Sequence, residues 1–267
     1  MASIYAYDFM YDDVPSQRFD LKIVTFEDGG LFSGVGSANV NILTQRVLRK
    51  SKPFYLGRTQ EPVLEFPLTF ASYRPVSGMD RDLISAWLFG RSTFKKLYIM
   101  QDDFNGAYFN CMFKDPEPQY IGNMNYAFNC TVSCDSPFAY GAEKIVSGSL
   151  SSEYLDLEIY NSSSEEEYLY PEVDFTISGG ASLSFYITNY SDNQRIFAFN
   201  NIPATSSIEV FMNNDMQIID SDTIGLLNYF NYNWFRLVPK INLLTLYSPQ
   251  TIDSFEIRYT ERFKIGG

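Results

Sequence analysis

The 267-residue sequence contains no histidine. Imidazole is the side chain that most often moves protons near neutral pH, and it completes the Ser-His-Asp and Cys-His arrangements of many hydrolases. Those mechanisms, histidine-based metal catalysis and imidazole proton shuttles are therefore closed to this chain. The sequence predicts no catalytic residue, and we do not expect an enzyme.

Cysteine is scarce as well, with three residues at Cys111, Cys130 and Cys134. The stretch YAFNCTVSC alternates strongly, which puts the last two thiols on one strand face together with Tyr126, Phe128 and Val132. We expect buried, small apolar side chains there. A zinc site would have only the three cysteines and a carboxylate to draw on, and an odd count without an export signal does not indicate a disulfide. No metal and no cofactor is predicted.

Phosphate-binding loops and membrane segments are also missing. The glycine-rich stretch GGLFSGVGS lacks the Lys-Ser/Thr of a P-loop, so we interpret it as a hairpin tip or a flexible loop. No apolar run is long enough to span a bilayer, and the start MASIYAYDFMYDDVP lacks the basic and then apolar regions of an export signal. We expect a soluble protein without membrane contact that is not exported by the general route.

Basic residues are few in the second half of the chain. Residues 1–140 carry 13 Lys and Arg against 15 Asp and Glu, a net charge of −2, whereas residues 141–267 carry 7 against 17, a net charge of −10, and the two sum to −12. Neutralising nucleic-acid phosphates needs clustered cations. We therefore expect no sequence-specific nucleic-acid binding.

What the second half does contain is alternation of apolar and polar residues in short stretches, as half-buried strands require. Turn-forming residues such as Gly179-Gly180, Asn200-Asn201 and Pro239 separate the stretches. The pattern predicts an antiparallel β-sandwich. Its apolar positions are Val173, Phe175, Ile177, Leu183, Phe185, Ile187, Ile208, Val210, Met212, Phe255, Ile257 and Tyr259.

The first half is predicted to be mainly β with one short helix. Pro67, in the strand EPVLEFPLTF, cannot donate to a strand ladder and favours an edge strand. The segment SGMDRDLISAWLFGR predicts a helix with Asp80 as N-cap and Gly90 at its end. Its apolar face is formed by Leu83, Ile84, Trp87 and Leu88. Strands follow in KKLYIM, in a hairpin with Asn105-Gly106 at its tip, and in a stretch that ends at Cys134.

The polar segment from Ser136 to Ser152 is the predicted boundary between two domains. The first, residues 1–140, would be a β domain with a helix near residues 80–90, and the second, residues 150–267, the β-sandwich. Within the second, NSSSEEEYLYP is interpreted as a solvated loop between strands, with an acidic recognition loop as the alternative.

Two alternatives for function follow from other residue types. The segment NYFNYNWFRL concentrates rings, and Tyr229, Tyr232 and Trp234 would be able to stack on a sugar if exposed, as in a carbohydrate-binding module. The other interpretation is that alternate rings fill the core and the rest cover it. With 32 Asp and Glu, a glycosidase pair of carboxylates also stays open, although Glu165, Glu166 and Glu167 lie in a polar loop.

Ordered segments carry a resemblance over nearly the whole chain. In the first half they are an early region ending near GVGS, then TQRVLRKSKPFYLGR, EPVLEFPLTF, DLISAWLFG and FNCTVSCDSPFAYG. In the second half they are YPEVDFTISGG, LSFYITN, IPATSSIEVFMNNDMQIIDSD with Asp220, WFRLVPKINLLTL and FEIRYTERF. This order resembles the distal tail proteins of long-tailed, non-contractile bacteriophages. The chain departs from the family's frequent Pro-Gly-x-Asn turn at Lys240, which leaves the turn type open.

The resemblance implies a ring, usually of six copies, at the far end of the tail tube. The first domains would surround the channel through which DNA leaves, and the second domains would radiate as galectin-like sandwiches. The implied partners are further copies of the chain, the tail tube protein, and tail-tip, baseplate and receptor-binding proteins. The implied location is the tail tip of the virion, after assembly in the host cytoplasm.

A basic stretch in the first half is the candidate contact. Arg46, Arg49, Lys50 and Lys52 are expected to lie near a neighbouring subunit or the tube. The alternative interpretation is a solvated strand edge.

Overall fold

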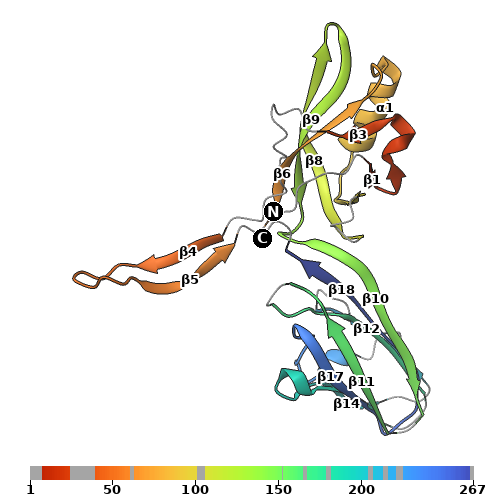
Figure 1. Ribbon diagram of the computed structural model, residues 1–267. Helices are drawn as coiled ribbons and strands as arrows, with labels where there is room; N and C mark the ends of the chain where they lie inside the picture. Colours follow the sequence, from red (N-terminus) through yellow and green to blue (C-terminus); the bar gives the residue numbers. More distant parts are fainter. Residues whose placement is uncertain are drawn as a thin grey trace. The chain divides into compact units, whose positions relative to one another are not determined.

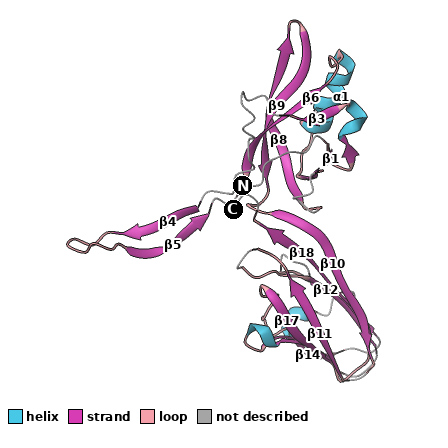
Figure 2. Cartoon of the chain, in the orientation of Figure 1, coloured by secondary structure: helices cyan, strands magenta, loops and turns pink. Residues whose placement is uncertain are grey.

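The computed structural model describes residues 8–24, 40–60, 63–100, 106–151, 153–164, 167–178, 182–203, 207–212, 216–220 and 225–264. The chain divides into two compact units. The N-terminal unit is Met1–Gly141 with Phe263–Gly267, and the C-terminal unit is Ala142–Arg262. Strands dominate both, and α1 (Gly78–Leu88) is the one α-helix of the described ranges (Figure 1, Figure 2). The predicted mainly β fold with one short helix is confirmed.

The N-terminal unit is built on an antiparallel sheet with the order β2-β1-β7-β8-β9-β6-β3. Helix α1 packs against it, since the Trp87 and Phe9 rings stack with their centroids 5.8 Å apart and the Trp87 indole donates to the Tyr11 carbonyl at 3.0 Å. Among the described helices, none has the length and apolar character to cross a membrane. The strands are β1 (Phe9–Tyr11), β2 (Val14–Pro15), β3 (Leu21–Ile23), β6 (Glu65–Ser72), β7 (Lys95–Ile99), β8 (Tyr108–Ile121) and β9 (Met124–Cys134), with the short 3₁₀ helix η1 (Ser16–Phe19).

The N-cap of helix α1 lies three residues before the predicted one. Ser77 is the N-cap, and its hydroxyl accepts from the Asp80 backbone N–H at 3.1 Å, so the prediction of Asp80 as cap is wrong. Asp80 instead lies in the first turn, where its negative charge interacts favourably with the positive end of the helix dipole. Leu83 is 53% exposed, so the predicted apolar face is wrong at that position, while its other three members are buried. Past the C-cap, a Cβ on Gly90 would lie 2.6 Å from the Ala86 carbonyl oxygen, which explains the glycine.

Strand β6 is not an edge strand, contrary to the prediction from Pro67. Its residues pair with β9 from Glu65 to Ala71, and β3 pairs on the other side from Phe70 to Ser72. Pro67 precedes the residues that β3 pairs in the described part of the sheet. A proline fits there because its missing N–H removes no bond to β3.

Other first-half predictions concern the hairpin and the thiols. Strands β7 and β8 form the expected hairpin, with Gly106 at a φ of 77°, while Asn105 and the stretch GGLFSGVGS lie outside the described residues. The three cysteines are free and buried, and burial was predicted for Cys130 and Cys134. Burial raises the pKa of Cys130 and of Cys134 to about 12, and that of Cys111 well above its ordinary value. No group of three or more potential metal ligands occurs among the described residues.

The C-terminal unit is a sandwich of two antiparallel sheets. One has the order β16-β15-β12-β18-β10, and the other β11-β17-β13-β14. Phe175 of β12 and Phe185 of β13 stack with centroids 4.1 Å apart, so the core lies between the sheets. Every predicted apolar position with a described side chain is buried, and that of Ile208 is not described. The predicted β-sandwich is confirmed, and its galectin-like form stays a prediction.

The strands of this sandwich are bounded as follows. The first sheet comprises β10 (Ala139–Leu150), β12 (Glu172–Ser178), β15 (Ser207–Met212), β16 (Ile218–Asp220) and β18 (Ile252–Phe263). The second comprises β11 (Tyr154–Asn161), β13 (Leu183–Asn189), β14 (Arg195–Ile202) and β17 (Lys240–Tyr247). Two 3₁₀ helices, η3 (Tyr190–Asp192) and η4 (Leu226–Tyr229), lie in the connections.

Candidate functional site

The four predicted basic residues lie together in the turn of a separate hairpin. Strands β4 (Val40–Gln45) and β5 (Phe54–Gln60) pair only with each other among the described strands, and Arg46, Arg49, Lys50 and Lys52 connect them. All four are exposed. The Lys50 ammonium lies 5.0 Å from the centre of the Phe54 ring, and its backbone N–H donates to the Val47 carbonyl at 3.1 Å.

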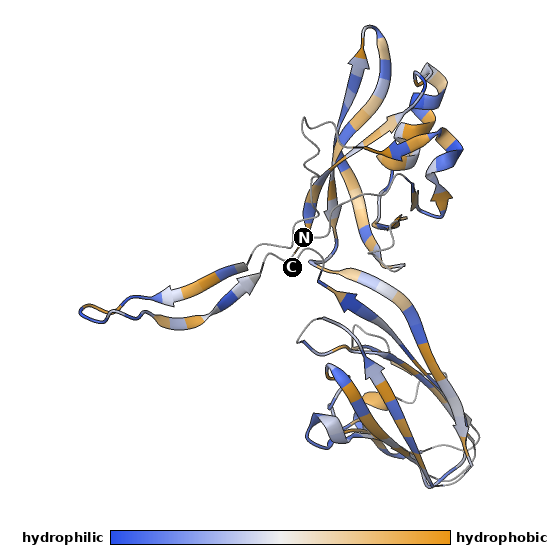
Figure 3. Cartoon of the chain, in the orientation of Figure 1, coloured by the Kyte–Doolittle hydropathy of each residue, from blue (hydrophilic) through white to orange (hydrophobic). Residues whose placement is uncertain are grey.

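The composition of this hairpin is unusual for a solvated turn. It carries a fifth basic residue, Arg58, and no acidic residue between Val40 and Gln60. Figure 3 shows hydrophobic colouring on both β4 and β5. Large apolar side chains are exposed along both strands and the turn: Ile42, Leu43, Val47, Leu48, Phe54, Tyr55 and Leu56. Contiguous exposed apolar surface marks interaction sites in proteins that fold and stay soluble.

The predicted ring cluster surrounds a buried phenylalanine. Phe230 is in the core, the Trp234 ring meets it edge-on with centroids 4.8 Å apart, and the Tyr232 ring lies 5.6 Å from it. Tyr229 and Trp234 are partly buried against the core, and Tyr232 is 64% exposed. Of the three rings, Tyr232 is the exposed one, and sugar binding by them stays a prediction.

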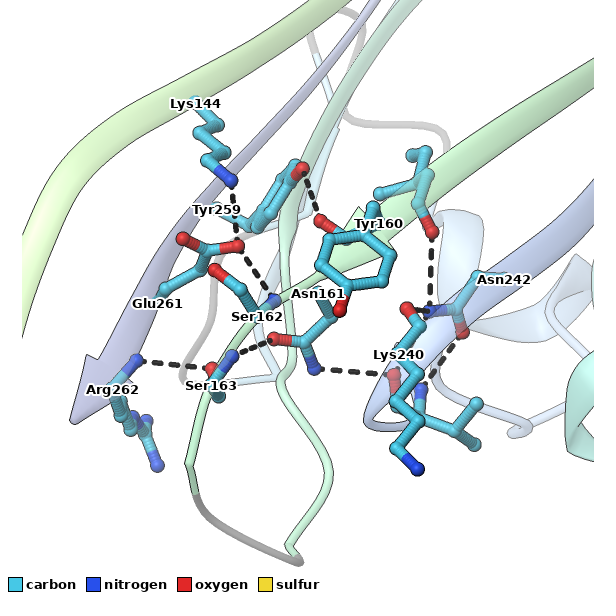
Figure 4. A network of polar contacts seen from close by, with 12 residues as sticks. Lys144, Tyr160, Asn161, Ser162, Ser163, Lys240, Asn242, Tyr259, Glu261 and Arg262 are labelled. Carbon is cyan, nitrogen blue, oxygen red and sulfur yellow. Dashed lines mark hydrogen bonds and ion pairs between the residues drawn. The ribbon is translucent and has the colours of Figure 1, made fainter. Parts of the chain in front are cut away.

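Sequence reasoning did not find the polar network behind the turn before β17 (Figure 4). The Asn242 side chain is fully buried, and its Oδ1 accepts from the Val238 N–H at 2.8 Å and from the Asn189 amide at 2.9 Å. Its Nδ2 donates to the Val238 carbonyl at 2.9 Å and to the Lys240 carbonyl at 3.2 Å. Asn161 donates to the same Val238 carbonyl at 3.1 Å. Asn161 and Asn242 therefore hold the backbone of the turn at Val238 and Lys240, and Asn189 holds Asn242 and the Arg236 carbonyl.

The sequence contained a signal for this network, in the alternation of apolar and polar residues along three strands. Asn161, Asn189 and Asn242 each stand on the buried side of a strand, two residues from Ile159, Ile187 and Leu244 respectively. A buried amide needs partners for both its donor and its acceptor atoms. An asparagine at an apolar position of three separate strands therefore predicts a shared polar cluster.

Lys240 adopts a φ of 73°, the left-handed conformation that favours glycine. The chain therefore keeps a left-handed residue at the position where the resemblance expects glycine.

We expect Lys240→Gly to raise the free energy of unfolding of the C-terminal unit by about 1 kcal/mol, since glycine adopts this conformation without Cβ strain. Denaturant unfolding measures the change. Lys240→Ala is the control: it removes the same charge but keeps a Cβ, and it should give no gain. An equal gain in both variants would assign the effect to the charge.

A second group ties down the start of the acidic segment NSSSEEEYLYP. The Ser162 N–H donates to the Glu261 carboxylate at 2.8 Å, and the Lys144 ammonium contacts the same oxygen at 2.7 Å (Figure 4). Burial opposes ionisation of Glu261, but these hydrogen bonds outweigh it and lower its pKa. The Ser163 hydroxyl accepts from the Arg262 N–H at 3.0 Å. The first residues after β11 are therefore fixed to β18 and are not a freely solvated loop, while Glu165 and Glu166 lie outside the described residues.

Arg236, which precedes the turn before β17, forms an ion pair with the buried carboxylate of Asp192. The Arg236 Nε and Nη2 atoms donate to the two Asp192 carboxylate oxygens at 2.6 and 3.0 Å, and the guanidinium carbon lies 3.6 Å from the centre of the Tyr168 ring. Asp192 is 4% exposed. The bonds to Asp192 raise the pKa of Arg236. Arg236 thus joins η3, the segment before β12 and the turn before β17.

Comparisons with known proteins now decide the family. Residues 4–136 match a family model described as a phage tail protein N-terminal domain, and residues 138–255 match one described as a phage tail C-terminal domain. The chain belongs to this family of phage tail proteins. Its predicted location in a phage tail is confirmed. Comparison with curated proteins by sequence gave no match.

A solved structure shows the same fold. The Dit protein of phage SPP1, described as a paradigm of the hub adsorption apparatus in phages that infect Gram-positive bacteria, is 13% identical with a TM-score of 0.67, covering 96% of this chain and 98% of that one. Chains of the activated phage P2 baseplate with Ca and with Sr are 10% and 9% identical, with TM-scores of 0.47 and 0.46. They cover 90% and 94% of this chain, and 90% and 97% of theirs. The resemblance to distal tail proteins is confirmed.

Proposed function

We propose that this phage tail protein is the hub of the tail tip. Several copies, six in the family's usual form, would make a ring that joins the tail tube to baseplate or tip proteins and to receptor-binding proteins. DNA would pass through the ring without being bound in a sequence-specific way. Residues 1–140 would form the ring, residues 150–267 would form the outer domain, and the role would be structural, with no catalysis.

The observation that carries this proposal is the β4–β5 hairpin. A two-stranded hairpin without a third strand is marginally stable in water. This one nevertheless exposes apolar side chains on both strands, with Leu48 88% exposed near its tip. Burial of that surface against another chain would supply the stability that the hairpin lacks by itself.

The charge of the hairpin indicates what it contacts. Its five basic residues face solvent in a chain with a net charge of −12. Complementary charge speeds association and fixes the register of the partners. A neighbouring copy of this acidic chain fits the hairpin on charge.

Replacing Arg46, Arg49, Lys50 and Lys52 together by serine is expected to abolish ring formation and leave a folded monomer. The serine chain keeps the turn but loses the charges that attract the partner. Size-exclusion chromatography with light scattering and electron microscopy of the full chain measure the assembly, and circular dichroism checks the fold.

The matched control exchanges each basic residue for the other kind, as R46K, R49K, K50R and K52R, and should still assemble because the charge is kept. A serine variant that forms normal rings would assign the four residues to a solvated turn. Wild-type protein that stays monomeric at every concentration, and is missing from purified tails, would refute the hub itself.

A further inference from the structure

Three tyrosines form a continuous row across the outer face of the sheet β11-β17-β13. Tyr154 and Tyr247 are directly paired in register, and so are Tyr247 and Tyr186. Their ring centroids lie 4.8 and 5.3 Å apart. Tyr154 is 60% exposed, and the other two are half-buried. The row spans about 10 Å, because neighbouring strands lie about 4.8 Å apart.

A row of polar side chains runs beside the rings on the same face. Asp156, Thr245 and Thr188 occupy the next outward positions of the three strands, again in register. The Thr245 hydroxyl donates to the Asp156 carboxylate at 2.5 Å. An open pocket begins there and continues along the strands, lined by Asp156, Glu158, Tyr190, Leu243 and Thr245 among others. Ring faces and hydrogen-bonding groups therefore lie side by side on one surface.

From this arrangement we propose that the outer face of β11, β17 and β13 binds a neutral saccharide chain. A sugar ring presents C–H groups on its faces and hydroxyl groups around its edge. The C–H groups carry the partial positive charge that packs well on the negative face of an aromatic ring. The hydroxyl groups need donors and acceptors at the rim, which the carboxylate of Asp156 and the hydroxyls of Thr188 and Thr245 supply.

The charge of the surface selects the kind of saccharide. Asp156 and Glu158 stand on the outer face, and the chain from residue 141 onward has a net charge of −10. Nucleic acids and phosphate- or carboxylate-bearing polymers would be repelled there, because like charges cost free energy when brought together. A neutral saccharide chain is not repelled by these carboxylates.

The N-terminal unit contains a comparable row that serves as an internal control. Tyr98, Tyr108 and Tyr140 are also paired in register, with ring centroids 5.3 and 5.5 Å apart. There, however, the Lys96 ammonium covers the Tyr108 ring at 4.7 Å, and all three rings are half-buried. A row of this kind also stabilises a sheet by cross-strand contacts. A substitution in the N-terminal row therefore tests the loss of such contacts without changing the proposed binding surface.

The test titrates the full chain with maltohexaose, cellohexaose and chitohexaose by isothermal calorimetry, with a hyaluronan hexasaccharide as the anionic probe. We expect at least one neutral probe to bind and the anionic probe not to bind. The double variant Tyr154→Ala, Tyr247→Ala should lower the association constant by about four- to hundredfold, since each stacked ring contributes about two- to tenfold. Tyr154→Phe with Tyr247→Phe should keep binding, because the ring faces remain.

The control variant Tyr98→Ala should bind the saccharide as the wild type does. The proposal is overturned if none of the neutral probes binds, if the double alanine variant binds unchanged, or if only Tyr232→Ala and Trp234→Ala reduce binding. Light scattering on the same variants should show unchanged assembly, so a failure here is distinguishable from a failure of the hub proposal.

Discussion

Replacing Asn242 by alanine is expected to lower the free energy of unfolding of the C-terminal unit by about 3 kcal/mol or more. The side chain is fully buried and bonds to Val238, Lys240 and Asn189. Alanine would leave the Val238 N–H and the Lys240 carbonyl without these bonds, while the Val238 carbonyl would keep its bond from Asn161. Each buried group left unpaired costs about 1–3 kcal/mol.

The two tryptophans allow this loss to be assigned to one unit. Trp87 belongs to the N-terminal unit and Trp234 to the C-terminal unit. In a Trp87→Phe background, denaturant unfolding followed by fluorescence reports Trp234 alone. Asn228→Ala is the matched control, because Asn228 is an exposed asparagine of the same unit, and it should change the stability by less than about 0.5 kcal/mol. Equal effects of the two substitutions would show that the network adds nothing to stability.

Arg236→Met is expected to cost about 3–5 kcal/mol, because it leaves the Asp192 carboxylate buried without its counter-ion. Asp192 is 4% exposed and Arg236 supplies two bonds to it, at 2.6 and 3.0 Å. Most of this loss of stability comes from the buried, unpaired charge of Asp192, and less from the lost contact with Arg236. Adding Asp192→Asn to the same chain should therefore recover most of the stability in the same fluorescence measurement.

Arg258 provides the control for the ion pair. It lies near three carboxylates, at 3.7 Å from Glu172 and 3.8 Å from Asp174 and in contact with Glu256, but these carboxylate side chains are 32%, 29% and 33% exposed, against 4% for Asp192. Water screens such pairs, so Arg258→Met should cost less than about 1 kcal/mol. If Arg258→Met were as damaging as Arg236→Met, burial of Asp192 would not be the cause.

The sequence predicted the strands well because apolar and polar residues alternate wherever one face of a strand is buried and the other is exposed. Phe175, Phe185 and Ile257 follow this rule, and all three are in the core. The helix was predicted for the same reason, but its start was misplaced because Ser77 and Asp80 are both good caps and only the folded backbone decides between them. Leu83 was wrongly placed in the core because it lies at the margin of the apolar face, and helical spacing alone does not show where the buried part of that face ends.

The parts that could not be predicted depend on long-range contacts. Asn161, Asn189 and Asn242 are far apart in sequence and meet only when β11, β13 and β17 are assembled. The tyrosine row depends on register, which alternation within a single strand does not determine. The basic residues of the β4–β5 turn were recognisable as a charged stretch, but the exposed apolar strands on either side became visible only in the folded hairpin.

The burial of all three cysteines makes the folded chain a convenient host for chemical labels. Thiolate is the reactive form, and burial keeps Cys111, Cys130 and Cys134 protonated and out of reach of reagents. A cysteine introduced on the surface would then be the only reactive thiol of the native protein. Fluorophores, spin labels or cross-linkers attached there would report distances within a tail without removal of the natural cysteines.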